Sequence, residues 1–196
     1  MWPGKRSDRL FVMSEVYSFA PVSSPQARVL ILGSMPGKRS LEMRQYYAHP
    51  QNAFWRIMAE LFDFDADQSY LARMEHLRNC GVALWDVLAA CTRESSLDSD
   101  IVESSIIAND FPAFLSQHPL IGHIYCNGAR SFQSFLRHVR PELSDKNLEI
   151  PVIRLPSTSP AHAAMDFQAK LDAWSIISDS IDQTILPTTV EFPNPS

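Results

Sequence analysis

The clearest pattern in the sequence is a set of short apolar runs separated by longer segments of helical periodicity. Such runs, without polar alternation, are typical of strands that are buried on both faces of a parallel sheet. The runs cover residues 28–32, 82–85, 123–126 and 151–155. We therefore predict a buried strand at each of these positions.

Helical periodicity fills the segments between the predicted strands. Phe54, Ile57, Met58 and Leu61 recur at helical spacing, and the pattern over residues 70–81 ends at a glycine, where a helix stop is expected. We predict further helices over residues 101–116, disturbed near Pro112, and over residues 129–139. One stripe of apolar residues predicts a long closing helix; it comprises Phe167, Leu171, Trp174, Ile177 and Ile181.

Alternating strands and helices predict a single α/β domain, an α/β/α three-layer fold around a four-stranded parallel sheet. We expect this domain to span residues 25–184, after a partly flexible N-terminal extension (1–24) and before a proline-containing tail (185–196). Ligands of such sheets bind outside the carboxyl ends of the strands. The loops that leave the predicted strands begin at Gly33, Asp86, Asn127 and Pro156, and they carry most of the unusual residues.

Composition excludes several classes of protein. In this 196-residue chain no apolar run approaches the roughly 20 residues of a membrane span, and no secretory leader is evident, so we expect a cytoplasmic protein. The three cysteines are scattered, which predicts reduced thiols and no metal or cofactor site. A net charge of −5 disfavours a general nucleic-acid binder, but residues 33–56 are locally basic.

The segment from Gly33 to Gly37, "GSMPG", is not a known phosphate loop, because its glycines are too close together for a Walker A sequence. Its two glycines permit close backbone approach and Pro36 stiffens the loop. Downstream, Tyr46 and Tyr47 could each stack on a ligand or pack against the sheet. Both interpretations stay open at this point.

Two further stretches carry chemistry. Asn52 stands where a helix begins, so its side chain could cap that helix, hold a water molecule, or do both. The loop over residues 155–163, "LPSTSPAHA", gathers hydroxyls and a histidine; these could contact phosphates or form a capping turn before the last helix.

Four stretches in this order, "GSMPG", "YYAHPQNAFW", "GVALWDVL" and "LPSTSPAHA", resemble the uracil-DNA glycosylase superfamily, and most closely its hypoxanthine-DNA glycosylase branch. The resemblance covers residues 29–174. It implies a four-stranded parallel sheet with helices on both sides, base flipping, and hydrolysis of the N-glycosidic bond to leave an abasic site.

The resemblance also implies roles for individual residues. Asn52 corresponds to the catalytic residue that holds the attacking water. The implied base-binding residues are Gly33, Ser34, Met35, Pro36, Gly37, Tyr47 and Asp86. The implied DNA-binding residues are Ser157, Thr158, Ser159 and His162, to which the local basic charge adds Lys38 and Arg39. Met35 and Leu155 depart from the pattern, because many members have a polar catalytic residue at these positions.

The expected function is therefore removal of a deaminated base from DNA by a monomeric enzyme without a cofactor. Hypoxanthine is the foremost base and uracil the second. Two alternatives are a non-catalytic module that binds damaged or single-stranded DNA, and an esterase or other hydrolase of small substrates on the same fold.

Overall fold

The predicted apolar runs form the strands of one parallel sheet, so the fold class is confirmed. This computed structural model describes residues 14–95 and 97–185. The strands stand in the order β3-β2-β6-β7 and are all parallel. They are β2 (Val29–Gly33), β3 (Val82–Asp86), β6 (His123–Asn127) and β7 (Val152–Leu155).

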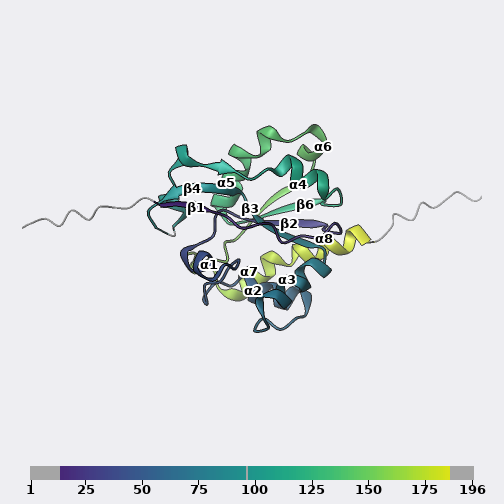
Figure 1. The fold of residues 1–196 in the computed structure, drawn as a ribbon. Coiled ribbons are helices and arrows are strands. Elements are labelled where there is room, and N and C mark those ends of the chain that lie inside the picture. The colour runs from purple at the N-terminus through teal and green to yellow at the C-terminus, as the bar shows by residue number, and fades with distance from the viewer. Residues whose placement is uncertain (1–13, 96, 186–196) are drawn as a thin grey trace, which may run out of the picture.

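Helices cover both faces of this sheet (Figure 1). One face carries α4 (Phe111–Gln117) and α5 (Ala129–His138). The other carries α2 (Phe54–Phe62), α3 (Tyr70–Asn79), α7 (Phe167–Trp174) and α8 (Ile176–Ile185).

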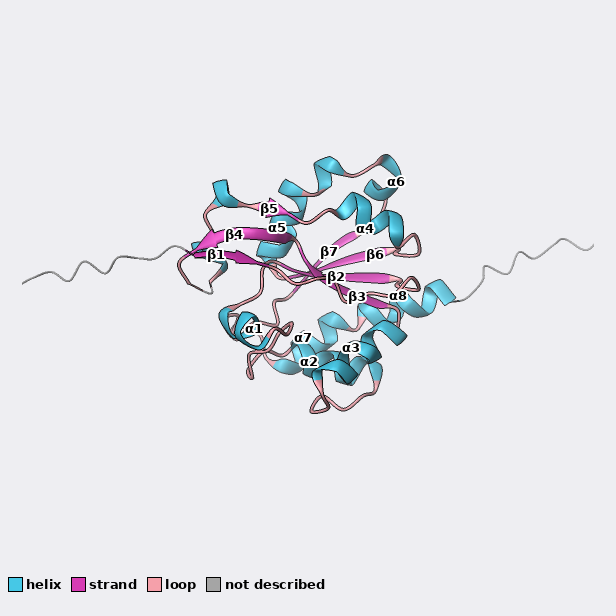
Figure 2. Ribbon diagram, in the orientation of Figure 1, coloured by secondary structure: helices cyan, strands magenta, loops and turns pink. Residues whose placement is uncertain are grey.

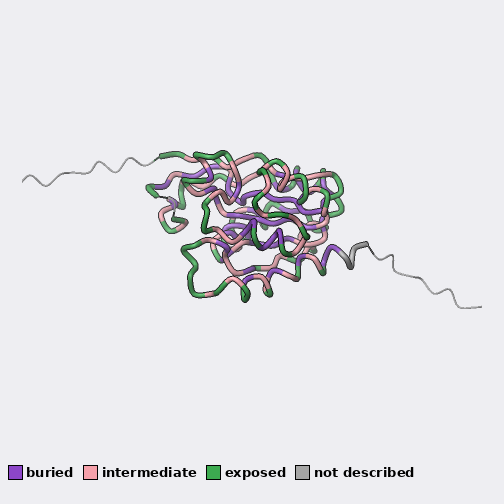
Figure 3. The backbone as a smooth tube through the Cα atoms, turned by 90° about the horizontal axis from the view of Figure 1, so that it is seen from below, coloured by how far each residue is buried: buried purple, intermediate pink, exposed green. Residues whose placement is uncertain are grey.

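Alternate residues of the central strand β2 supply the two cores. Leu30 and Leu32 pack in the core with α4 and α5, whereas Val29 and Ile31 pack with the helices of the opposite face. This alternation follows from the two-residue period of a strand. Figure 3 accordingly shows buried backbone running through the middle of the molecule.

A second, antiparallel sheet was not predicted (Figure 2). It has the order β1-β4-β5 and consists of β1 (Ser14–Tyr17), β4 (Leu88–Arg93) and β5 (Ile107–Ala108). The chain passes from β3 to β4 through Val87 alone, so the two sheets meet beside the carboxyl end of β3. Residues 14–24, expected to lie in an extension, are part of the fold, because β1 pairs with β4 and Val22 bridges to Leu84.

The predicted helix over residues 101–116 is wrong in its first part. That part holds a short 3-10 turn, η2 (Glu103–Ser105), and then β5. The helix α4 begins only at Phe111, where the Asp110 carboxylate accepts a hydrogen bond from the Ala113 N–H at 3.0 Å. Pro112 lies in the first turn of α4 and therefore starts the helix instead of disturbing it.

The predicted long closing helix is divided at Ser175 into α7 and α8. Serine hydroxyls around the division bond to carbonyls of the preceding turn, with Ser175 Oγ donating to Asp172 O at 2.8 Å and Ser178 Oγ donating to Ser175 O at 2.7 Å. Such bonds compete with the helical ladder and bend helices. The remaining short elements are α1 (Lys38–Met43), η1 (Asp98–Asp100), η3 (Arg140–Glu142) and α6 (Asp145–Leu148).

Parts of two predictions lie outside the described residues, namely residues 1–13 of the expected extension and residues 186–196 of the expected tail. Within residues 14–95 and 97–185, no helix has the length and apolar character needed to cross a membrane.

Trp174 connects the core on the side of the sheet covered by α2, α3, α7 and α8 to the loop after β7. We expect its replacement to weaken the packing of this core and the attachment of the loop. Its ring is fully buried and packs edge-on against Phe54, while its Nε1–H donates to Pro156 O at 2.9 Å. Trp174→Phe should lower the free energy of unfolding by about 1–3 kcal/mol, because it removes the hydrogen bond and leaves a small cavity. Urea denaturation measures this; an unchanged midpoint would show that the Nε1–H bond and the volume lost with the indole contribute nothing.

Candidate active site

A cavity of about 830 Å³ lies at the carboxyl ends of β2, β3 and β6. Every residue singled out from the sequence as a site residue lines it. Tyr46, which the sequence left open as a stacking or a packing residue, also lines it. So do residues that sequence reasoning did not select: Ser40, Glu42, His49, Leu97, Asp98, Ser99, Asn127, Pro160 and Ala161.

The two adjacent tyrosines have different places, which resolves the ambiguity left by the sequence. Tyr46 is 3% exposed, and its hydroxyl donates to backbone carbonyls in the segment that follows β1. The Tyr47 ring stacks on Phe54 with 4.0 Å between ring centroids, and Tyr47 lines the cavity. Its φ of 54° lies in the left-handed region, where an aromatic residue is strained. Both tyrosines line the cavity; Tyr47 does so with its ring stacked on Phe54, and Tyr46 does so with its hydroxyl bonded to the backbone.

Gly33, Asp86 and Tyr47 meet at one point of the cavity wall. Gly33 and Asp86 are paired at the ends of β2 and β3. A Cβ on Gly33 would lie 2.2 Å from Asp86 Oδ1 and 3.2 Å from the Tyr47 hydroxyl oxygen. Gly33 therefore has no side chain because the Asp86 carboxyl occupies that space. Gly37 differs, since a Cβ there would meet nothing within 4 Å, so close packing does not explain this second glycine.

The Asp86 carboxyl is in an unusual electrostatic position. It is 3% exposed, and its Oδ2 has no hydrogen-bond partner among the described residues. Burial raises the pKa of Asp86 to about 8; the negative charge of Asp98 adds to this rise and the positive charge of Arg93 opposes it. The raised pKa favours the protonated form of this carboxyl over the ionised form. The Tyr47 hydroxyl is also buried, and burial raises its pKa, although the nearby Asn127 side chain opposes the rise.

Two residues that sequence reasoning missed make side-chain hydrogen bonds to the segment Gly33–Gly37. Ser34 Oγ donates to Asp98 Oδ1 at 2.7 Å, and Arg93, which is 2% exposed on β4, donates to Pro36 O. The carbonyls of Gly33 and Ser34 accept hydrogen bonds from the N–H groups of Val87 and Leu88. Because the described peptides are all trans, the N–H groups of Ser34 and Met35 point the opposite way, away from the β3–β4 connection.

The Asn52 side chain caps the first N–H of α2, as one interpretation above expected, but from one residue before the N-cap position. Ala53 occupies the N-cap position and α2 begins at Phe54. Asn52 Oδ1 accepts a hydrogen bond from the Phe54 N–H at 3.0 Å, while the Asn52 N–H donates to His49 O at 2.8 Å. The side chain is therefore anchored at the cavity wall by the backbone N–H of Phe54. Its second oxygen lone pair and its amide N–H groups are the groups with which it can hold a water molecule.

Thr158 connects three parts of the site. Its N–H and Oγ1 bond to the two ends of the Asn127 side chain, at 2.9 and 2.8 Å, and its carbonyl accepts from the Ala53 N–H at 3.0 Å. Thr158 is only 1% exposed. Its buried side chain is therefore in the wrong place for the DNA contact expected from the sequence. It positions the loop instead.

The rest of this loop is fixed by short local bonds and by α7. Ser157 Oγ accepts from the Ser159 N–H at 3.2 Å, and Ser159 Oγ accepts from the Ala161 N–H at 3.3 Å. The Lys170 ammonium donates to His162 O at 2.9 Å. Leu155 is buried in the core on the side of the sheet covered by α2, α3, α7 and α8. It does not line the cavity and contributes no polar group there.

The rim of the cavity has a basic and an acidic side. Lys38 and Arg39 of α1 lie on one side, where Arg39 pairs with Glu42 at 3.4 Å and both side chains are exposed. Asp98 lies in the turn that forms another part of the wall, next to the exposed Leu97. The distribution favours the α1 side for an approaching phosphate backbone.

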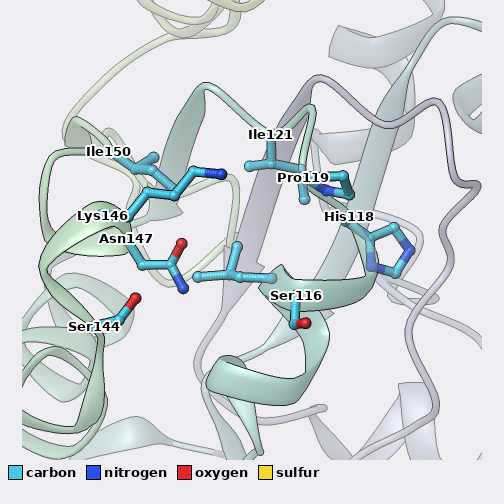
Figure 4. A pocket seen from close by; sticks show the side chains of 9 residues that line it. Ser116, His118, Pro119, Ile121, Ser144, Lys146, Asn147 and Ile150 are labelled. Carbon is cyan, nitrogen blue, oxygen red and sulfur yellow. The ribbon is translucent and has the colours of Figure 1, made fainter.

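A smaller cavity, about 300 Å³, lies at the other end of the parallel sheet. Lys146 and Asn147 of α6 line one side of it, and His118, Pro119 and Ile121, which precede β6, line the other (Figure 4). None of the residues with expected site roles is in it.

We expect Gly33→Ala to disturb the cavity wall. The added methyl group would overlap the Asp86 carboxyl, so the free energy of unfolding should fall by about 1–3 kcal/mol. Gly37→Ala is the matched control: its methyl group meets open space, and its change should stay within about 0.5 kcal/mol. Urea denaturation of both variants measures the difference; equal stabilities would contradict the packing described around Gly33.

Thr158→Val should test the link between Asn127 and α2. Valine has the shape of threonine but cannot accept the hydrogen bond from Asn127 Nδ2, so a buried donor is left unpaired. The expected loss in the free energy of unfolding is about 1–3 kcal/mol. Thr158→Ser keeps the hydroxyl and should be the less destabilised of the two; the reverse order, measured by thermal unfolding, would contradict this role for Oγ1.

Comparison with known proteins agrees with this architecture. Residues 20–177 match the family described as the uracil DNA glycosylase superfamily. A hypoxanthine DNA glycosylase of Methanosarcina barkeri is 36% identical over 114 residues, which are 58% of this chain and 71% of that protein. A hypoxanthine DNA glycosylase of Methanosarcina acetivorans is 33% identical over 145 residues, 74% of this chain and 86% of that one.

A solved structure shares the fold as well. The solution NMR structure of a Methanosarcina acetivorans protein, provisionally described as a uracil DNA glycosylase, matches with a TM-score of 0.72 and 28% identity. The match covers 86% of this chain and 99% of that one. With a family match over residues 20–177, and with this sheet and cavity, the chain belongs to the uracil DNA glycosylase superfamily.

Proposed function

We propose that the protein is a DNA glycosylase that hydrolyses the N-glycosidic bond of a flipped, deaminated base and leaves an abasic site. One observation carries the proposal: an aromatic wall, a buried carboxyl group and an anchored amide line the same cavity, in Tyr47, Asp86 and Asn52. Stacking and edge hydrogen bonds are what a pocket for a flipped base requires. Hypoxanthine is the proposed base, because two relatives are named for it and a cavity of about 830 Å³ can admit a purine.

In the proposed mechanism, activation of the attacking water contributes little to the rate. As the bond breaks, the sugar develops oxocarbenium character and the base accumulates negative charge. Asn52 holds the attacking water through its amide, but an amide cannot remove a proton at neutral pH. The N–H groups of Ser34 and Met35, which point away from the β3–β4 connection, are the proposed backbone donors for the departing base. Poor leaving groups would therefore be spared.

The proposed DNA contacts are polar and basic residues that line the cavity. Lys38, Arg39 and His162 are the proposed phosphate contacts, together with Ser157 and Ser159 in the loop after β7. We withdraw Thr158 from this set because its side chain is bonded to Asn127 and buried. The protein would act as a monomer in the cytoplasm, on DNA that contains a deaminated base.

The deciding experiment follows single-turnover cleavage of labelled duplexes that carry one deoxyinosine, one deoxyuridine, or no altered base, with alkali to break the strand at abasic sites. Asn52→Ala should release hypoxanthine at least about a hundredfold more slowly than the wild type, because it removes the group that holds the water. Gln51→Ala is the control, since Gln51 is exposed and does not line the cavity.

The outcomes separate the candidate functions. Full activity of Asn52→Ala would refute the role of Asn52. Preference for deoxyuridine over deoxyinosine would move the substrate to uracil within the same reaction. DNA binding without strand breakage at either base, measured by fluorescence anisotropy, would support the alternative of a damage-binding module, in which Met35 and Leu155 have replaced catalytic side chains.

A further inference from the structure

The strained backbone of Tyr47 is not explained by its ring contact alone. Its φ of 54° is unfavourable for an aromatic residue, because the left-handed region places Cβ close to the following carbonyl oxygen. Such a conformation persists only where the surrounding structure over-determines it. Since peptide groups are planar, the φ and ψ of Tyr47 are defined by the orientations of the two peptide groups that flank it. The contacts that maintain the strain must therefore act on these two groups.

Both flanking peptide groups are held by side chains. The carbonyl before Tyr47 belongs to Tyr46, and it accepts a hydrogen bond from Trp55 Nε1–H at 2.8 Å. The N–H after Tyr47 belongs to Ala48, and it donates to Ser40 Oγ at 3.2 Å. Trp55 and Ser40 are both buried, so water competes little for either bond. The two bonds together fix the peptide planes on either side of Tyr47.

Three helices supply the groups that hold this segment. Trp55 lies in the first turn of α2 and packs edge-on against Tyr70 of α3, with 5.8 Å between ring centroids. The Tyr70 hydroxyl accepts from the Tyr46 N–H at 3.0 Å, so α2 and α3 bind the carbonyl and the N–H of the same residue. Ser40 lies in α1. The conformation of the segment between α1 and α2 thus depends on how these helices pack.

The place of Tyr47 matters because Phe54 connects it to Asn52. The Tyr47 ring stacks on Phe54 with 4.0 Å between ring centroids, and the Phe54 N–H donates to Asn52 Oδ1 at 3.0 Å. A base stacked on Tyr47 and a water held by Asn52 would therefore be placed relative to one another through Phe54. A displacement of about 1 Å in such a relation can slow a reaction about a hundredfold.

We propose that Ser40 and Trp55 are positioning residues for base release: by fixing the two peptide groups that flank Tyr47, they hold its ring where a stacked base meets the water on Asn52. The proposal rests on the proposed glycosylase function and adds to it two residues that act through the backbone. Trp55 does not line the cavity, so its effect on the reaction must pass through Tyr46 and Tyr47.

The test measures single-turnover release of hypoxanthine from a duplex with one deoxyinosine, over a range of enzyme concentrations. Ser40→Ala removes the acceptor of one hydrogen bond, and Trp55→Phe removes the donor of the other while it keeps an aromatic ring. The maximal rate should fall at least about tenfold in each variant. The enzyme concentration that gives half the maximal rate should change little, because the residues proposed to contact phosphates are unaltered.

Ser180→Ala is the matched control. Ser180 is as buried as Ser40, each being 6% exposed, and its hydroxyl donates to Ile176 O at 2.8 Å within α8, outside the cavity. This variant should have a lower Tm and the maximal rate of the wild type. If Ser40→Ala and Trp55→Phe behave in the same way, their bonds serve stability alone and the proposal is overturned. Should one of these two variants fail to fold, the other decides.

A second measurement does not depend on activity. The backbone chemical shifts of Tyr47, and the coupling between its amide and α protons, report its φ by NMR. In Ser40→Ala and in Trp55→Phe these values should move away from those of the left-handed region, because one flanking peptide group is released and the strain can relax. In Ser180→Ala they should stay as in the wild type. Unchanged values in Ser40→Ala and Trp55→Phe would overturn the proposal even if the rates fell.

The two measurements separate this proposal from the broader one. A wild type that releases hypoxanthine, with full maximal rates in Ser40→Ala and Trp55→Phe, would leave the glycosylase function standing and overturn the positioning role. A wild type that releases no base from any duplex would overturn the glycosylase function. The NMR values of Tyr47 would then still decide whether the two side chains fix its conformation.

Discussion

The pair of hydrogen bonds between Asn127 and Thr158 is the constraint on which the rest of the site depends. Asn127 ends β6, Thr158 lies in the loop after β7, and the Thr158 carbonyl receives the N–H of Ala53 at the start of α2. Segments more than a hundred residues apart in sequence are thereby held in a fixed relation. Asn52 immediately precedes Ala53, and Ser157 and Ser159 flank Thr158, so the junction sets where the water, the base and the phosphates could lie relative to one another.

The cavity relies on preorganisation more than on reactive side chains. Tyr47 is held in a strained backbone conformation and stacked on Phe54, Asn52 is anchored by the Phe54 N–H, and Ser34 is bonded to Asp98. These contacts order the groups when the chain folds, so the cost of ordering them falls on folding. This arrangement suits a reaction whose difficulty lies in the departure of the base. It also accounts for a site in which Met35 and Leu155 supply no polar group.

The parallel sheet could be predicted because strands buried on both faces leave an unmistakable apolar run. The residues that line the cavity could be predicted because polar residues are concentrated where those runs end. The antiparallel sheet could not, since β4 (Leu88–Arg93) mixes small and polar residues and its pairing with β1 is a long-range event. Arg93 could not be selected, because a charged residue is rarely buried and its contact is with Pro36 O, which is distant in sequence. Asp98 lies in an acidic turn, and only the folded chain brings it to Ser34. Asn52 resembled a helix cap because its side chain does bond to the backbone, but one residue outside the cap position.

The second sheet makes the start of the described chain part of the structure that supports the cavity. β1 pairs with β4, and Arg93 of β4 donates a hydrogen bond to the Pro36 carbonyl. β4 follows β3, which ends at Asp86, after one intervening residue. Residues 14–17 are remote from the cavity in sequence, yet they support it by pairing with β4. A shortened version of the protein that lacked this strand would expose the backbone of β4 as an open edge, free to pair with other chains. Loss of base recognition and a tendency to self-associate would then have one common origin.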